Sequence, residues 1–144
     1  MILAGRRLND SMGSYVADQV SKLMTKKRIH VVDANILIMG LTFKENCPDI
    51  RNTRVVDLIE EFEGFNCNVD VYDPWVDKDE AVHEYNIKPI DKPIKSKYDA
   101  ILLAVAHDEF KALTVEQIRA YGKDNHVLYD IKYLIKAHKS DGRL

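Results

Sequence analysis

Short, almost continuously apolar stretches are the feature that most constrains the fold of this chain. Residues 35–41 (NILIMGL) and 98–106 (YDAILLAVA) are apolar at nearly every position, which is typical of strands buried on both faces of a parallel sheet. Three further strands are expected at 68–72, 87–90 and 126–130. Because helical patterns lie between them, the sequence predicts an α/β domain with three layers, in which helices cover both faces of a mainly parallel five-stranded sheet.

A helix is expected before the first strand, over residues 9–27, because its apolar side chains recur at three- and four-residue spacing. Its apolar stripe consists of Met12, Tyr15, Val16, Val20, Leu23 and Met24. The same period predicts a second helix that begins near Val55 and ends at Gly64. Shorter helices are expected at 78–85 and 114–121, and a mobile polar tail at 138–144.

Composition excludes several classes of protein. The chain has 144 residues, 46% of them hydrophobic and 31% charged, with a net charge of −2, which fits one globular domain better than a basic nucleic-acid binder. Since no apolar run approaches the roughly 20 residues that cross a bilayer, and MILAGRRLND has no signal-peptide core, we expect a cytoplasmic protein with neither membrane nor nucleic-acid partners. The cysteines and histidines lack metal-ligand spacing, so no metal site is predicted.

The loop after the first strand, residues 40–54, holds the most candidate binding residues. It contains Lys44, Arg51 and Arg54, and it leads directly into the second helix. Because helix amino termini and nearby cations both attract anions, this loop suits a phosphate or diphosphate group. Neither the P-loop pattern nor the GxGxxG fingerprint is present.

Three details of this loop follow from the residues alone. Asn52 or Thr53 is expected to cap the helix that follows. Cys47 has no histidine base near it in sequence, so we expect no catalytic role for its thiol. The alternative to an anion site is a solvated surface loop, whose lysine and arginine pair with Glu45 and Asp49.

Other candidate residues follow strands whose carboxyl ends lie at the same edge of the expected sheet, where ligands of parallel sheets bind. Lys132 is expected to point over this edge, as Lys44 does, while Asp130 orients either the backbone or Lys132. His107 lies beside an aspartate and suggests acid–base chemistry, although such a histidine more often caps a strand end. Asp73 ends the second strand and is interpreted as a turn residue.

The 40–54 loop resembles the F-K-x-x-x-x-D-x-R signature of the UDP-glucose/GDP-mannose dehydrogenase family, through Phe43-Lys44 and Asp49-x-Arg51. Similar matches occur at Arg7-Leu-Asn9-Asp10, Val71-Tyr-Asp73-Pro74, Tyr98-Asp99-Ala100 and Tyr129-Asp130-x-Lys132. The stretches KENCPDIRNT and SDGRL look most like the branch that oxidises UDP-N-acetylhexosamines for capsule and Vi-type polysaccharides.

The resemblance implies a Rossmann-like domain that binds the UDP end of a UDP-sugar. Family members use NAD twice to oxidise the sugar C6 from an alcohol to a carboxylate, with a UDP-N-acetylhexosamine or UDP-glucose as the substrate. By position, Lys44 and Lys132 match residues that contact the substrate, and Arg51 matches an arginine that reaches the cofactor. None of the expected contact residues is a catalytic nucleophile.

The sequence departs from the family pattern in ways that imply a division of the protein. Met12-Gly13 stands where the glucose-specific branch has an arginine that reaches the neighbouring subunit, so Arg7, or else Arg6, is expected to contact the substrate instead. Residues 1–28 are expected to be the end of an inter-domain helix used for dimer contact, and 29–144 the UDP-binding domain. The NAD fingerprint and the glycine-flanked catalytic cysteine are expected in an N-terminal domain outside this chain, which alone is expected to be inactive.

Two alternatives from other functional classes remain at this point. A receiver-like signalling module has a similar five-stranded sheet, but it needs an aspartate where the first strand here ends in Met39-Gly40. An oligomerisation domain without a ligand is the other alternative.

Overall fold

The computed structural model describes residues 2–51 and 53–144, and their side chains from Met12 onward. Its centre is a five-stranded sheet of order β2-β1-β3-β4-β5, in which every neighbouring pair is parallel. The strands are β1 (Asn35–Met39), β2 (Asn68–Tyr72), β3 (Tyr98–Leu103), β4 (Gly122–Asp130) and β5 (Gly142–Arg143). The expected α/β fold is confirmed.

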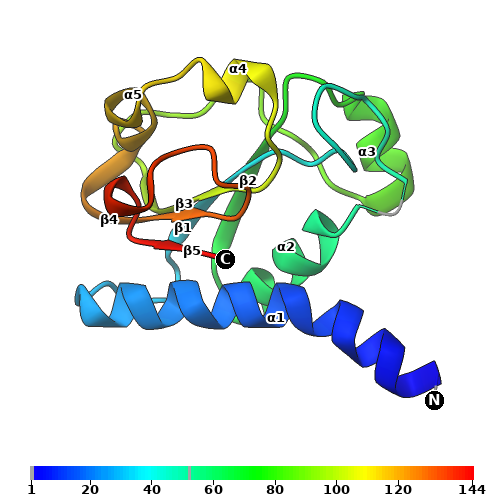
Figure 1. Ribbon diagram of the computed structural model, residues 1–144, viewed down its shortest axis with the longest axis horizontal. Helices are drawn as coiled ribbons and strands as arrows, with labels where there is room; N and C mark the ends of the chain where they lie inside the picture. The colour runs from blue at the N-terminus through cyan, green and yellow to red at the C-terminus, as the bar shows by residue number, and fades with distance from the viewer. Residues whose placement is uncertain (1, 52) are drawn as a thin grey trace.

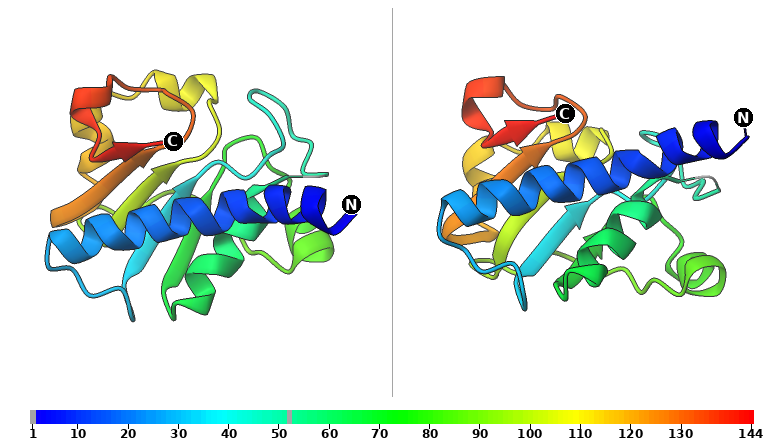
Figure 2. Two further views of the ribbon diagram at one scale, coloured as in Figure 1. Left: turned by 60° about the horizontal axis from the view of Figure 1, so that its bottom comes forward. Right: turned by 90° about the horizontal axis from the view of Figure 1, so that it is seen from below.

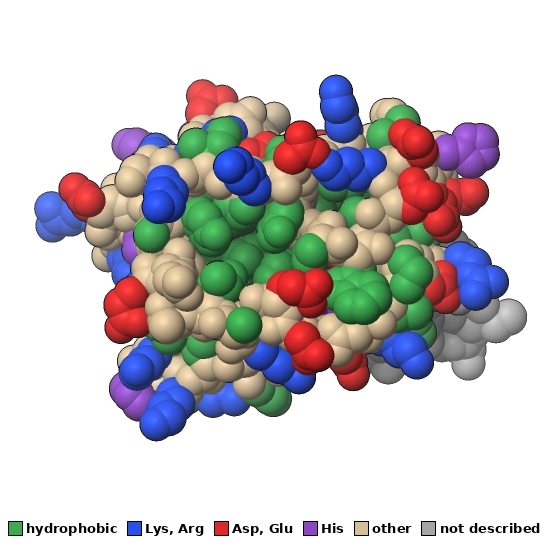
Figure 3. Space-filling view, turned by 90° about the horizontal axis from the view of Figure 1, so that it is seen from above, with side chains coloured by type: hydrophobic (Ala, Val, Ile, Leu, Met, Phe, Trp, Pro, Cys, Tyr) green, Lys and Arg blue, Asp and Glu red, His purple; other side chains and the backbone are tan. Residues whose placement is uncertain are grey.

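Helices cover the two faces of this sheet unequally. The elements are α1 (Ile2–Lys26), α2 (Val55–Gly64), α3 (Lys78–Tyr85), α4 (Asp108–Lys111), α5 (Val115–Arg119) and the 3-10 turn η1 (Ala137–Lys139). The long α1 and α2 lie against one face, and the short α4 and α5 against the other (Figures 1 and 2). On the side of α4 and α5, apolar side chains gather in the middle of the surface, with charged side chains around them (Figure 3). Among the described residues, no helix combines the length and apolarity that a membrane crossing requires.

Alternation along the strands divides the core between the two faces. Ile36 and Ile38 belong to the cluster that includes the buried face of α1 and α2. Leu37 and Met39 belong to a second cluster, which includes Phe110 of α4. Because successive side chains of a strand point to opposite faces, a strand covered on both sides must be apolar throughout. This is why continuous apolar runs, and not alternating ones, identified β1 and β3.

Two expectations at the edges of the sheet are wrong. Residues 87–90 do not form a strand, and one backbone hydrogen bond, from Ile90 N to Val71 O at 2.8 Å, joins them to β2. Pro89 lies within this segment and has no N–H to donate to a ladder. The tail expected to be mobile instead supplies the fifth strand, β5, which pairs with the end of β4.

Asp141 holds this tail in place. Its carboxylate accepts hydrogen bonds from Leu128 N at 2.7 Å and Arg119 Nη1 at 3.2 Å, and it pairs with Lys27 Nζ at 3.0 Å. Burial alone would raise the pKa of Asp141, but these donors lower it below its usual value. The tail is therefore fastened by groups that lie on α1, α5 and β4.

The buried face of α1 differs from the expected stripe. Val16, Val20 and Met24 are buried as expected, whereas Met12 and Tyr15 are 47% and 53% exposed. The helix presents its small residues to its neighbours instead: Ala17 is fully buried, and a Cβ on Gly13 would lie 3.2 Å from backbone atoms of α2. Close approach of two helices favours small side chains at the crossing, and this rotates the two large residues outward.

Two glycines follow apolar segments in similar ways but have different structural roles. Gly40, directly after β1, has a φ of 112°, and a Cβ there would lie 2.6 Å from the Val105 Cβ. Gly64 was expected to end α2, but it is the last helical residue, and Asn66 adopts the left-handed conformation with a φ of 63°. No atom lies within 4 Å of a Cβ built on Gly64.

These surroundings predict opposite effects of alanine at the two glycines. Gly40→Ala should lower the free energy of unfolding by about 2–4 kcal/mol, because it combines a strained φ with overlap at Val105. Gly64→Ala, the matched control, should raise it by about 0.5–1 kcal/mol by restricting the unfolded chain. Urea unfolding of both variants measures the difference, and equal destabilisation by the two would contradict this account.

A second prediction concerns His126, which lies beside the groups that fasten the tail. Its Nδ1–H donates to Lys123 O at 2.6 Å, and its Nε2 accepts from Arg119 Nη1 at 3.1 Å. Burial, together with Arg119 and Lys27, holds the pKa of His126 below its usual 6.5. Below about pH 6.5 the unfolded chain therefore binds more protons than the folded chain, so stability should fall as the pH decreases from 7.5 toward the folded pKa.

Urea unfolding at pH 7.5 and 5.5 tests this dependence. His126→Asn removes the titrating ring but keeps a possible donor to Lys123 O, so it should lose less stability over this range than the unmodified chain. His83→Asn, at an exposed position of α3, is the control and should leave the pH dependence unchanged. An unaltered pH dependence in His126→Asn would refute the role of this ring.

Candidate functional site

The sheet order indicates where a ligand binds. The chain leaves β1 through α2 on one face and leaves β3 through α4 and α5 on the other face. Because β1 and β3 are neighbours, their connections diverge at the carboxyl ends of these two strands, which is the usual position of a ligand crevice in open parallel sheets. The loops that border it are residues 40–54 and 104–107.

A cavity of about 350 Å³ opens at this edge. Its apolar lining comes from five elements or loops and includes Val16, Phe43, Leu58, Val105 and Ile131. Arg54 and Lys132 are the charged side chains that line it. The volume lies within the range of about 300–1,000 Å³ that small-molecule sites occupy, and a mostly apolar lining with a few polar groups is typical of them.

A larger hollow, of about 520 Å³, lies at the opposite edge of the sheet, where the strands begin. Its lining includes cations and anions together, among them Arg28, Lys123, Asp33 and Asp99. Since ligands of parallel sheets bind at the carboxyl ends and charges of both signs attract no anion, the smaller cavity is the candidate site.

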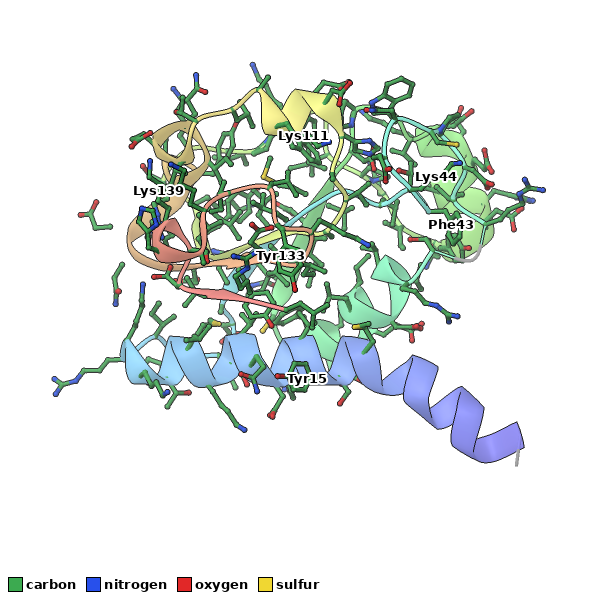
Figure 4. The ribbon with its side chains drawn as sticks, in the orientation of Figure 1. Tyr15, Phe43, Lys44, Lys111, Tyr133 and Lys139 are labelled. Carbon is green, nitrogen blue, oxygen red and sulfur yellow. The ribbon has the colours of Figure 1, made fainter. Side chains whose placement is uncertain are left out.

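The predicted cations occupy two different positions. Lys132 lines the cavity, whereas Lys44 and Arg51 lie in the exposed part of the 40–54 loop, next to Phe43 (Figure 4). Arg7, the remaining predicted contact residue, lies outside the residues whose side chains are described. The structure therefore brings Lys132 to the cavity and leaves Lys44 beside its rim, one residue from Phe43.

Arg51 forms the ion pair that was expected for a solvated loop. Its Nε and Nη2 donate to the two carboxylate oxygens of Asp49, at 3.0 and 3.1 Å. The Arg51 side chain remains 82% exposed. The hydrogen bond from Arg51 lowers the pKa of Asp49, and the same bond raises the pKa of Arg51. The second pair of that alternative, Lys44 with Glu45, is not formed among the described residues.

Arg54 is the cavity residue that sequence reasoning did not select as a contact. It takes the capping position of α2, without a side-chain cap, where Thr53 or Asn52 was expected. Thr53 lies one residue earlier, donates to Leu41 O at 2.7 Å and accepts from Val55 N at 3.3 Å; Asn52 is not described. A cation at the positive end of a helix is unfavourable by itself, and this conflict is the sequence signal that could have identified Arg54.

A buried carboxylate and a buried imidazole join the loops at this edge. Asp73 Oδ2 accepts from Leu41 N at 2.6 Å, Thr42 N at 3.0 Å and His107 Nε2 at 2.9 Å, and its Oδ1 accepts from Trp75 N at 2.7 Å. The last bond confirms the expected turn. Burial alone would raise the pKa of Asp73, but the hydrogen bonds from His107 and the three amides lower it.

Asp130 organises the loop after β4 in a similar way. Its fully buried carboxylate accepts from the backbone N–H groups of Lys132, Leu134 and Ile135, at 3.2, 3.1 and 3.0 Å. Of the two expected roles, Asp130 therefore orients the backbone and not the Lys132 side chain. Within this loop Tyr133 adopts a left-handed φ of 60° and stacks against the Arg143 guanidinium, 4.0 Å from its ring centroid.

The cysteines do not form a reactive or metal-binding group. Cys67 is buried, which raises its pKa to about 11 and disfavours the thiolate that a nucleophile requires. Cys47 is half-buried in the 40–54 loop. No group of three potential metal ligands occurs among the residues that the structure describes.

Comparison with known proteins identifies the fold and the site together. Residues 37–137, which include β1, the loop after it and the loop after β4, match the family model for the UDP-binding domain of UDP-glucose/GDP-mannose dehydrogenases. The chain belongs to this family. It is 59% and 55% identical, over all 144 residues, to the UDP-N-acetyl-D-glucosamine 6-dehydrogenases of Pseudomonas aeruginosa and Salmonella typhi. It spans 34% of the length of each of these relatives.

A solved family structure agrees with this assignment. The UDP-D-ManNAc dehydrogenase of Pyrococcus horikoshii superposes with a TM-score of 0.74 and 26% identity, over 91% of this chain and 29% of that one. The family resemblance seen in the sequence is therefore confirmed, and the receiver-like alternative is not.

The Asp130 network predicts a stability effect that depends on its hydrogen-bond acceptors. Asp130→Ala should lower the free energy of unfolding by about 2–4 kcal/mol, because backbone N–H groups lose their charged acceptor inside the protein. Asp130→Asn keeps one acceptor oxygen and should lose less. Urea unfolding of both variants measures this order, and an alanine variant as stable as the unmodified chain would show that the loop does not depend on this carboxylate.

Proposed function

We propose that this chain is the UDP-sugar-binding domain of an NAD-dependent UDP-N-acetylhexosamine 6-dehydrogenase, which oxidises the sugar C6 alcohol to a carboxylate. The observation that carries the proposal is the cavity at the carboxyl edge, where Arg54 and Lys132 line an otherwise mostly apolar surface. High identity to two UDP-N-acetyl-D-glucosamine 6-dehydrogenases favours an N-acetylhexosamine over glucose as the sugar.

The chemistry of the cavity suits a nucleoside diphosphate. Lys132 and Lys44 supply point charges for phosphate or sugar oxygens, and Arg54 supplies a planar guanidinium that can bind two phosphate oxygens at once. The amino end of α2 lies directly after Arg54 and adds a partial positive charge. The apolar lining from Val105 and Ile131 suits the flat face of a nucleoside.

The remaining contacts belong to the whole enzyme. We propose that Arg51, whose guanidinium is largely exposed, reaches an NAD held mainly by an N-terminal domain, and that Arg7 adds a substrate contact. In this arrangement residues 1–28 end the helix that joins the two halves, residues 29–144 form the UDP-binding domain, and the enzyme is a cytoplasmic homodimer. The exposed Met12 and Tyr15 on α1 suit a contact with another part of that assembly. The chain alone should bind nucleotide without turnover.

Calorimetric titration of this chain with UDP tests the site. Lys132→Ala and Arg54→Ala should each weaken UDP binding by about tenfold, or about 1.4 kcal/mol, because each removes a cation facing the diphosphate. Lys44→Ala, at the rim, should weaken it by about threefold or more. Lys111→Ala is the control, since it removes an equivalent exposed charge from α4, on the other side of the sheet (Figure 4).

Two further titrations make the result specific to the diphosphate. Uridine should bind much more weakly than UDP, and added salt should weaken UDP binding to the unmodified chain more than to Lys132→Ala. Equal UDP affinities for the unmodified chain and all three site variants would reject the proposed site.

A further inference from the structure

We propose that His107 is the positioning residue for the loop that carries Lys44, and that it acts through a hydrogen bond to the backbone of Asn46. This inference rests on the proposed UDP site, because it assigns a function to the position of Lys44. His107 lies at the end of β3, its side chain is fully buried, and it is bonded to both of the other loops at the crevice.

The hydrogen bonds of His107 require one arrangement of its ring proton. Asp73 Oδ2, 2.9 Å from Nε2, accepts hydrogen bonds only, so Nε2 must carry the proton. The backbone N–H of Asn46 points at Nδ1 from 2.9 Å, so Nδ1 must accept. The imidazole therefore joins Asp73, at the end of β2, to Asn46 in the 40–54 loop, and only the neutral ring with its proton on Nε2 makes both bonds.

The same ring is connected to the backbone on both sides of Lys44. Two residues before Lys44, the Thr42 hydroxyl lies 3.1 Å from His107 Nε2 and donates to Lys44 O at 3.1 Å. Two residues after it, Asn46 donates its N–H to His107 and accepts from Asp108 N at 3.0 Å through its side chain. Asn46 has a left-handed φ of 56°, which places the turn of the loop at the residue that His107 holds.

The surroundings of the ring exclude a water that could replace it. Trp75 stacks over His107 with ring centroids 6.1 Å apart and an interplanar angle of 24°, and Phe110 contacts it edge-on at 5.4 Å. Trp75 is in turn held by a 3.0 Å bond from its Nε1 to Glu109. Hydrogen bonds in such a water-poor place are strong and costly to lose. Because both ring nitrogens are occupied and buried, His107 positions the loop and does not act as an acid or base on a ligand.

Two substitutions separate the two nitrogens of the ring. The amide of Asn superposes approximately on the Nδ1 side of histidine and that of Gln on the Nε2 side. His107→Asn can therefore keep an acceptor for Asn46 N–H while it loses the donor to Asp73. His107→Gln can keep the donor to Asp73 while it loses the acceptor for Asn46.

The readouts are amide hydrogen exchange at Asn46, by NMR, and UDP affinity, by calorimetry. His107→Gln should speed exchange of the Asn46 amide at least about tenfold and weaken UDP binding at least about fivefold. His107→Asn should leave both closer to the unmodified chain, a difference that a general loss of packing does not produce. Combined with Lys44→Ala, His107→Gln should cause little further loss of UDP affinity, because its effect passes through Lys44.

Several results would overturn the proposal. Unchanged Asn46 exchange in His107→Gln would show that the ring does not hold the loop. Faster exchange with unchanged UDP affinity would show that holding the loop does not position Lys44, and the proposed site would still stand if Lys132→Ala weakened UDP binding. If the unmodified chain bound no UDP, the proposed function would fail, and this inference about Lys44 would fail with it.

A second variant keeps the test decisive if His107→Gln does not fold. Thr42→Val is nearly isosteric and removes the hydroxyl that joins His107 to Lys44 O. It should weaken UDP binding in the unmodified background and have little effect when combined with Lys44→Ala. Equal losses in both backgrounds would reject the connection from His107 to Lys44.

Discussion

The buried carboxylate of Asp73 is the interaction on which the candidate site depends. A carboxylate removed from water destabilises the fold by several kcal/mol unless donors surround it, and here Leu41, Thr42, Trp75 and His107 supply four hydrogen bonds. These donors belong to the connections that follow β1, β2 and β3. Satisfying one buried charge therefore fixes three loops relative to each other, at the place where the chain connections diverge and a crevice opens.

Rigid supports and exposed cations have separate roles at this edge. Asp73 and Asp130 are buried and accept backbone N–H groups, so each sets the course of a loop. Lys44 and Lys132 extend from those loops toward solvent or the cavity. A site gains affinity when its charged groups are held in place before the ligand arrives, because less conformational freedom is then lost on binding. The two acids thus support a site to which they contribute no direct contact.

The net charge of −2 conceals an uneven distribution that suits this role. Arg54 stands at the amino end of α2, where a lone cation is unfavourable, and Lys132 lines the same cavity. A bound diphosphate would relieve both the conflict of Arg54 with the helix and the mutual repulsion of the cations. The unfavourable placement is therefore understandable as a feature of a ligand site and not of the folded domain by itself, which agrees with the general observation that local rules are broken at functional positions.

The sequence by itself determined the layers of the fold and the edge at which the site lies, because periodicity and strand ends are local properties of the chain. It predicted β1, β2, α2 and α3 closely, and it selected Lys44, Arg51 and Lys132 from loops that do lie at the carboxyl edge. Only the tertiary structure decided that β5 replaces the expected strand at 87–90, that α1 rotates to bury Ala17, and that Arg54 lines the cavity while Arg51 pairs with Asp49. The physical reason is the same in each case: the deciding partners, such as Lys27 and Arg119 for Asp141 or α2 for Gly13, are brought together by folding and leave no pattern in the local sequence.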